Sequence, residues 1–238
     1  MGSDPGEPYF WGAEYPKHTV YLDSFWIYRT EVTNAMYRLC VEQEGCSEPS
    51  APSSRTHENY FGSLEFNNYP VIHVTQEDAV SYCQWAGARL PTEAEWEKAA
   101  RGTDGMLFPW GDGALQNNFA NFCDEGCPDP DPKAIQRGMD DGYRETAPVG
   151  SFPAGASPFD ALDMAGNVLE WVSDWYGQDY YSQSPYENPT GPENGTKHII
   201  RGGSWWSGPD GLRPAARASR ALDFSSDMVG FRCAVGTP

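Results

Sequence analysis

Apolar residues recur at helical spacing in three stretches of the first half of the chain. They predict helices over residues 33–42, 75–87 and 92–102. The third is the clearest, because Thr92 and Glu95 form the pattern of a capping box and Gly102 stands where a helix commonly ends.

Strand patterns are shorter and lie mostly in the second half. Residues 18–28 alternate between apolar and polar and predict a strand or hairpin, and β-rich runs predict short strands at 168–174, 199–201 and 229–234. The intervening stretches, above all 47–70 and 103–160, are rich in turn residues. No composition break marks a linker and no segment repeats. Early helices followed by short strands and long loops predict an α+β fold in a single domain over residues 1–238.

Charge and composition exclude several classes of partner. The 16 basic and 34 acidic residues give a net charge of −18, so phosphate repulsion disfavours nucleic acid. No apolar run approaches the ~20 residues of a membrane span, and the first residues lack a basic then apolar signal peptide. We expect no membrane span and no nucleic acid partner. The sequence leaves open whether the chain is part of a larger polypeptide.

The six cysteines suggest disulfides. Two close pairs, Cys40 with Cys46 and Cys123 with Cys127, suit small loops, which leaves Cys83 and Cys233 for a long-range bond. Spacing alone cannot prove this connectivity. A zinc cluster is the alternative, but the chain has no CxxC pair. Disulfides would place the protein at the cell surface, outside the cell or in the cytoplasm of a thermophile.

Common catalytic patterns are missing. The sequence contains no GxSxG elbow, no P-loop and no HExxH motif, and no histidine lies near Ser204 in sequence to activate it. The four histidines have no metal-ligand spacing: His18, His57, His73 and His198. What stands out instead is the segment 206–229, which has neither helical nor strand period. It lies between Arg201-Gly-Gly-Ser-Trp205 and Gly230-Phe-Arg-Cys233, and it predicts a loop surface on a rigid scaffold.

Five motifs in order resemble one family. They are Arg89-Leu-Pro-Thr-Glu-Ala-Glu-Trp-Glu97, Phe108-Pro-Trp-Gly111, Met164-Ala-Gly-Asn-Val-Leu-Glu-Trp171, Arg201-Gly-Gly-Ser204 and Gly230-Phe-Arg-Cys233. From about Tyr21 to its end the chain resembles the formylglycine-generating enzyme, or sulfatase-modifying factor, domain. The resemblance implies a C-type-lectin-like fold of this type and the pairing of Cys83 with Cys233. Fold alone does not settle function.

The resemblance also implies two calcium ions. One would be held by the side chains of Asn121 and Asp141 with the carbonyls of Phe122 and Tyr143. The other would be held by Asp163 and Glu170 with the carbonyls of Gly166 and Val168. Mixed carboxylate and carbonyl oxygens are what calcium prefers.

The catalytic residues of the family are not carried over. Its oxidases bind copper(I) through two cysteines whose positions here are Ser207 and Leu212. Copper(I) selects soft ligands, so no copper is expected. The related iron enzymes need a histidine triad that this chain lacks. We therefore predict no catalytic residues, and a copper oxidase or related sulfatase-modifying enzyme remains the alternative.

A second subgroup of this fold, the variable proteins of diversity-generating retroelements, resembles the chain more closely. Its framework matches Leu212-Arg-Pro-Ala-Ala-Arg217 and Val229-Gly-Phe-Arg232. The resemblance implies a non-catalytic protein whose hypervariable segment binds an unknown protein or cell-surface ligand, with Trp206 and Phe224 as anchors. The other predicted contact residues are Ser207, Gly208, Asp210, Gly211, Ala216, Ala218, Ser219, Ala221, Leu222, Ser225, Ser226 and Asp227. Trp205 is predicted to lie in the core. The arginines are predicted to pair with acids: Arg201, Arg213, Arg217, Arg220 and Arg232.

Overall fold

A computed structural model describes residues 1–236. It contains three α-helices, α1 (Asn34–Glu42), α2 (Gln76–Trp85) and α3 (Glu93–Arg101). All three predicted helices are confirmed, and each begins after a threonine whose hydroxyl accepts a backbone N–H of the first turn. The capping box of α3 is present as predicted, with Glu95 accepting the N–H of Thr92 at 2.8 Å.

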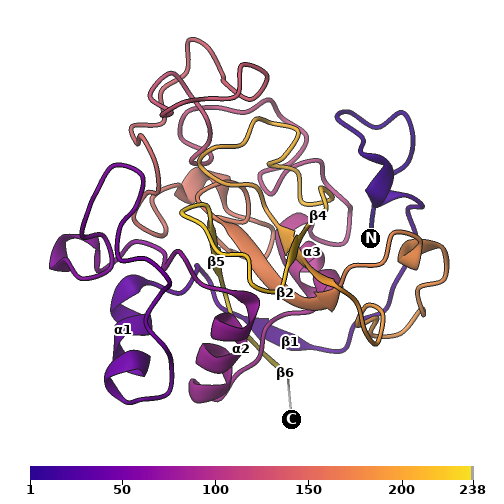
Figure 1. The fold of residues 1–238 in the computed structure, drawn as a ribbon. Helices are drawn as coiled ribbons and strands as arrows, with labels where there is room; N and C mark the ends of the chain where they lie inside the picture. The colour runs from indigo at the N-terminus through magenta and orange to yellow at the C-terminus, as the bar shows by residue number, and fades with distance from the viewer. Residues whose placement is uncertain (237–238) are drawn as a thin grey trace.

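The strands form two small sheets (Figure 1). In the first, β2 (Leu169–Trp175) lies between β3 (Lys197–Arg201) and β5 (Val229–Phe231), and β4 (Ala218–Ala221) pairs with β3. The β2–β5 pair is parallel and the other two pairs are antiparallel. The second sheet is an antiparallel pair of β1 (Phe25–Ile27) and β6 (Ala234–Gly236).

Three strand predictions need correction. Residues 18–28 form only the three-residue β1, without a hairpin, because its partner β6 comes from the other end of the chain. The predicted strand 229–234 is divided into β5 and β6, which belong to different sheets. The segment 206–229 was predicted to be aperiodic, but it contains β4, whose register is set by β3. In each case long-range pairing outweighs local pattern.

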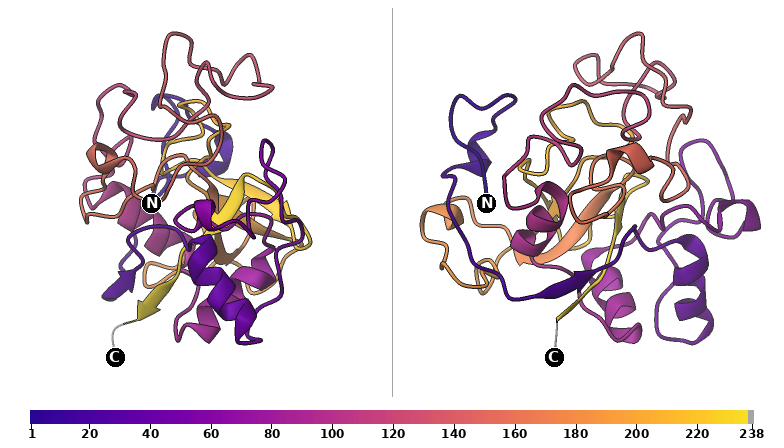
Figure 2. Two further views of the ribbon diagram at one scale, coloured as in Figure 1. Left: turned by 90° about the vertical axis from the view of Figure 1, so that its left-hand side faces the viewer. Right: turned by 180° about the vertical axis from the view of Figure 1, so that it is seen from behind.

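Short 3-10 turns punctuate the loops: η1 (Gly12–Glu14), η2 (Leu64–Phe66), η3 (Pro153–Gly155) and η4 (Tyr180–Ser182). The turn-rich stretch 103–160 lies at the end of the molecule opposite α1 and α2 (Figures 1 and 2). The fold is thus α+β with few helices and many irregular loops, as predicted. No helix within residues 1–236 has the length and apolar character needed to cross a membrane.

The main apolar cluster joins α1 and α2 to the four-stranded sheet. Tyr37 and Tyr82 stack at 5.6 Å and meet Phe231 of β5 edge-on, next to the fully buried Trp171 of β2. A second cluster packs Trp96 and the alanines of α3 on the other side of β2. The sheet is therefore covered by helices on both faces, which leaves the loop end of the molecule as its displayed surface.

All six cysteines are paired, and the pairing is the one that spacing suggested. The bonds join Cys40 to Cys46, Cys83 to Cys233 and Cys123 to Cys127. The Cys83–Cys233 bond spans 150 residues and ties α2 to the segment between β5 and β6. The zinc alternative is excluded for these cysteines, since every thiol is consumed.

The long-range disulfide should contribute more stability than a short one. Loop-closure entropy predicts a loss of about 5 kcal/mol for Cys83→Ala with Cys233→Ala, and about 2 kcal/mol for Cys40→Ala with Cys46→Ala as the matched control. Both can be measured by urea unfolding under oxidising conditions. Equal losses for the two double variants would contradict the entropic argument.

Candidate functional site

Two arginines anchor the C-terminal segment to α3. Arg201, at the end of β3, reaches the carboxylate of Glu97 at 2.6 Å and donates to the carbonyls of Pro214 and Ala216 at 2.5 and 2.8 Å. Arg217 forms a two-pronged pair with Glu93 at 2.7 and 2.9 Å. Because all four charged side chains are buried, residues 214–217 are held from both ends.

Two further arginines form buried ion pairs of the same kind. Arg213 pairs with Glu14 of η1 through contacts of 2.8 and 2.6 Å, and Arg232 pairs with Glu170 of β2 through two contacts of 2.7 Å. The prediction that the arginines pair with acids is thus confirmed for four of the five. Arg220 differs: it is exposed, donates to the carbonyl of Ser219 and lies 5.2 Å from the Phe224 ring centre.

Two buried acids beside these ion pairs, Glu97 and Asp174, have pKa values shifted in opposite directions. Burial alone raises the pKa of Glu97, but the charges of Arg201, the N-terminal amine and Arg101 outweigh it and hold the pKa at about 2. Burial and the neighbouring Glu93 raise the pKa of Asp174 to about 7. Asp174 accepts the N–H of Glu93 and the hydroxyl of Ser173, which fixes the first turn of α3 to β2.

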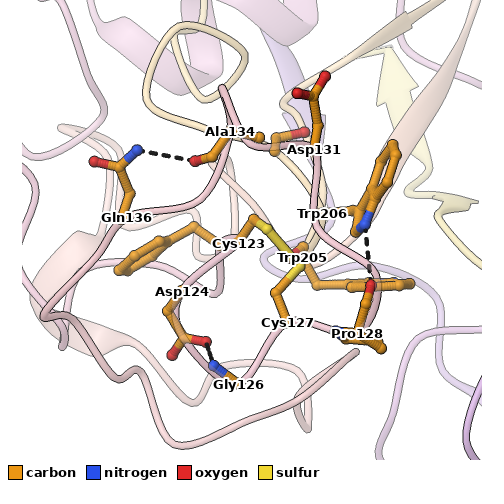
Figure 3. The surroundings of a disulfide bond; sticks show 12 residues. Cys123, Asp124, Gly126, Cys127, Pro128, Asp131, Ala134, Gln136, Trp205 and Trp206 are labelled. Carbon is orange, nitrogen blue, oxygen red and sulfur yellow. Dashed lines mark hydrogen bonds between the residues drawn. A yellow bond between two sulfur atoms is a disulfide. The ribbon is translucent and has the colours of Figure 1, made fainter.

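Two tryptophans fix the start of the segment. Trp205 is buried, as predicted, and its indole N–H donates to the carbonyl of Asp227 at 3.1 Å, so it connects the two ends of the loop. Trp206 is half-buried and donates to the carbonyl of Pro128 at 3.3 Å, beside the Cys123–Cys127 disulfide (Figure 3). The N–H of Cys123 in turn donates to the carbonyl of Ser207 at 3.0 Å. The disulfide loop therefore forms one wall of the surface.

A residue that the sequence did not reveal completes the surface. Arg55 bonds the carboxylate of Asp227 at 3.1 Å and lies 5.3 Å and 5.9 Å from the ring centres of Trp205 and Trp206. It comes from the loop 47–70, which has no period that could point to it. Nearby, the hydroxyls of Ser50 and Ser225 lie 2.7 Å apart. The surface is thus composite and extends beyond the C-terminal segment.

A buried carboxylate holds the loop that carries Arg55. Glu145 accepts the hydroxyls of Ser54 and Thr56 at 2.7 Å each and contacts Nδ1 of His57 at 2.6 Å. Burial raises the pKa of Glu145, but the hydrogen bonds from Thr56, Ser54 and His57 leave it below its usual value. The carboxylate is therefore charged, and its hydrogen bonds fix the loop from which Arg55 extends.

Most of the predicted contact residues are accessible. Trp206, Phe224 and ten others are half-buried or exposed: Ser207, Asp210, Gly211, Ala218, Ser219, Ala221, Leu222, Ser225, Ser226 and Asp227. Gly208 and Ala216 lie inside, contrary to their predicted place on the surface. A side chain at Gly208 would meet the carbonyl oxygen of Ala134 at 2.9 Å, and Ala216 is held beneath the surface by Arg201.

The two copper positions are filled by residues with structural tasks. The hydroxyl of Ser207 accepts the N–H of Ser204 at 3.0 Å and closes a tight turn. Leu212 is fully buried against Phe108 and Phe122. Neither position can offer a thiolate to a metal ion.

The first predicted calcium set is well arranged for a cation. The side-chain oxygen of Asn121 is buried without a hydrogen-bond partner. The oxygens of Asp141 accept the N–H groups of Phe122 and Tyr143 at 2.8 Å each, which fixes the carboxylate beside the backbone of both residues. Burial raises the pKa of Asp141 to about 7, and a bound cation would stabilise its charged form. The residues present fit calcium.

The second predicted set does not fit calcium as it is arranged. Both oxygens of Glu170 are taken by Arg232, and one of them also accepts the indole N–H of Trp96 at 2.9 Å. Asp163 accepts the N–H of Gly150 at 2.6 Å, and burial together with the charge of Glu170 raises its pKa. The charge of Glu170 is already balanced by a buried guanidinium. Among residues 1–236, no three His, Cys, Asp or Glu side chains converge as a metal site.

Comparisons with known proteins agree on the family. The family described as Sulfatase-modifying factor enzyme 1-like domain matches residues 1–237. A formylglycine-generating enzyme of Streptomyces coelicolor is 36% identical over 276 residues, covering 98% of this chain and 85% of its own length. The enzyme of that name from Mus musculus is 37% identical over 210 residues, covering 85% of this chain and 52% of its own. This chain thus spans about half of the mouse relative.

Two solved structures share the fold. PvdO from Pseudomonas aeruginosa superposes with a TM-score of 0.79 at 27% identity, covering 100% of this chain and 90% of its own. Treponema denticola variable protein 1 superposes with a TM-score of 0.73 at 22% identity, covering 99% and 91%. The second likeness concerns the fold alone.

The raised pKa of Asp174 predicts a pH dependence of stability. Since its folded pKa lies near 7 and its unfolded value near 3.8, its stabilising contribution is present below about pH 4 and lost as pH rises to about 7. Asp174→Asn should remove this slope, worth up to about 4 kcal/mol. Unfolding free energies measured from pH 4 to 8 test it. A slope that persists in the variant would assign it to another group.

The division of the segment into buried and exposed residues is also testable. Ala216→Gln should cost about 2–4 kcal/mol, because a longer polar side chain is forced into a buried site. Leu222→Gln, at a side chain that is 48% exposed, should change stability by less than about 0.5 kcal/mol. Chemical unfolding of both variants measures the two changes in unfolding free energy. Equal costs would mean that the loop repacks freely.

Proposed function

The chain belongs to the sulfatase-modifying factor enzyme 1-like domain family, and from this we propose that it is a non-catalytic, ligand-binding member. Its binding surface is the segment 206–228 on a rigid scaffold, as in the variable proteins of diversity-generating retroelements. The observation that carries the proposal is the burial of Leu212. An apolar side chain packed in a core cannot serve as one of a pair of copper ligands.

The geometry of the surface supports recognition. Buried ion pairs fix the base of the segment, while Trp206 stays partly accessible beside Arg55 and Phe224 beside Arg220. Accessible aromatic side chains beside polar neighbours are typical of interface hot spots. The likeness to Treponema denticola variable protein 1 supports the scaffold, and the partner would be a protein or cell-surface ligand.

The proposed diversification has a decisive test in the gene's surroundings. A reverse transcriptase and a near-copy of codons 201–233 that differs at adenines are expected close by. Sister copies should then vary mainly at the accessible positions, while the codons for Gly208 and Ala216 stay fixed. A neighbourhood without either element would leave a fixed binding protein and refute the retroelement part of the proposal.

One calcium ion forms part of the proposal. Asn121 and Asp141, with the carbonyls of Phe122 and Tyr143, would hold it and bind the loop near Cys123 to the loop 141–143. The ion would supply charge neutralisation, because it would offset the buried carboxylate. A stiffer loop would then support Trp206, whose indole N–H donates to the carbonyl of Pro128 in the same loop.

Calcium should raise the melting temperature by about 5–10 °C over chelator. Asp141→Ala should abolish this difference. Asp140→Ala, which changes the exposed neighbour, should keep it. The comparison is made by calorimetry with calcium and with EDTA. A calcium effect that survives in Asp141→Ala would remove the assignment.

A second candidate is a copper oxidase of the formylglycine-generating type. The names of the Streptomyces and mouse relatives favour it. It requires copper-dependent oxygen uptake with a cysteine-containing peptide, which the native chain should not show. Uptake that exceeds the copper blank would overturn the non-catalytic proposal, whatever the gene's surroundings contain.

A further inference from the structure

A groove of about 800 Å³ lies away from the segment 206–228 and shares no residue with it. Its lining comes from five separate parts of the chain: residues 21–24 before β1, Arg89, Leu90, Thr92 and Glu95 around the start of α3, Ser173 of β2, residues 188–190 after η4, and Gly236 of β6. Pockets of this size hold small ligands of one to a few rings. Nothing in the proposed function uses it.

Two planar polar pairs are fixed along its walls. Asn188 accepts the N–H of Asp23 and donates to its carboxylate, both at 2.9 Å, although the two residues lie 165 positions apart. Arg89 and Glu95 form a two-pronged ion pair with both contacts at 2.6 Å. These pairs hold the side chains in one orientation before any ligand arrives.

The pairs leave hydrogen-bonding capacity unused. A guanidinium has five N–H donors, and Arg89 uses three of them, two on Glu95 and one on the carbonyl of Leu90. The amide of Asn188 keeps one N–H, and the carboxylate of Asp23 keeps one oxygen. Both donors and acceptors therefore remain for a ligand at fixed positions, which is suited to hydroxyl groups, since a hydroxyl can donate and accept.

Tyr21, which lines the groove, is stacked on Tyr186 just outside the lining. Tyr21 and Tyr186 stack with ring centres 6.5 Å apart and are 49% and 59% exposed. Backbone bonds between Tyr21 and the stretch 186–188 hold the pair, at 2.7 and 2.8 Å. An exposed, immobilised aromatic face favours a ligand with an apolar C–H face beside its polar groups.

Charge narrows the ligand class. Arg89 contributes one positive charge, and Glu95 and Asp23 one negative charge each, so the lining carries −1 on a chain of net −18. Anions are repelled, and the single uncompensated carboxylate is already bonded by Asn188. From the groove's size, its fixed polar pairs and its aromatic rim, we infer that it binds a neutral carbohydrate of about two sugar rings. No metal ion is needed.

The test uses the full chain and saturation-transfer NMR with maltose, cellobiose, lactose and diacetylchitobiose as probes. At least one of them should receive saturation, and digalacturonic acid, an anionic two-ring sugar, should receive less. Amide shifts on titration should map to Tyr21 and Asn188 and spare residues 206–228. The inference is wrong if no neutral probe receives saturation, or if the amide shift changes are confined to residues 206–228.

Variants localise the site. Tyr21→Ala should weaken binding by up to about tenfold, since it removes the stacked face. Asn188→Gly tests the polar pair, because Asn188 has a positive φ of 43° that glycine tolerates. Tyr9→Ala, at another exposed tyrosine outside the groove, is the control and should bind normally. Melting curves verify folding, and unchanged binding in both folded groove variants would overturn the inference. The outcome is independent of the gene-neighbourhood and oxygen-uptake tests.

Discussion

The structure depends on glutamates of α3 that point inward and on the arginines that meet them. Glu93 and Glu97 are buried between the four-stranded sheet and the C-terminal segment, where an unpaired carboxylate would be very costly. Arg201 and Arg217 supply the opposite charges and also donate hydrogen bonds to backbone carbonyls. Because Arg201 contacts both Glu93 and Glu97, removing one of these side chains would disturb the charge balance of the whole buried cluster that holds the base of the segment.

The buried ion pairs divide the C-terminal segment into a part that is fixed by packing and a part whose side chains can change. Residues 212–217 face inward between the arginines and an apolar cluster, so their side chains are set by packing. Residues 218–228 form β4 and a return loop, which are held by the pairing of β4 with β3 and by contacts from Trp205, Arg55 and Ser50. Their partly exposed side chains accept substitution at little cost in stability, which suits the proposed binding role.

The two sets of predicted calcium ligands show how a neighbour decides what a carboxylate can do. Asp141 accepts two backbone N–H groups but has no basic partner, and the side-chain oxygen of Asn121 is buried without a hydrogen bond. Glu170 is instead paired with Arg232, which follows β5. The proposed calcium ion would therefore have a role in charge balance at Asp141 that Arg232 already fills at Glu170.

The sequence by itself determined the helices, the family fold and the absence of thiolates at positions 207 and 212. These features are local: a threonine cap, a capping-box glutamate or a missing cysteine is read within a few residues. Two short spacings and the family resemblance suggested the disulfide pairing, and the structure established that Cys83 is bonded to Cys233. Only the tertiary structure decided that β4 forms, that Ala216 is buried and that Arg55 joins the surface. Each of these depends on contacts between residues far apart in the chain, such as the 172 positions between Arg55 and Asp227, and no local pattern encodes them.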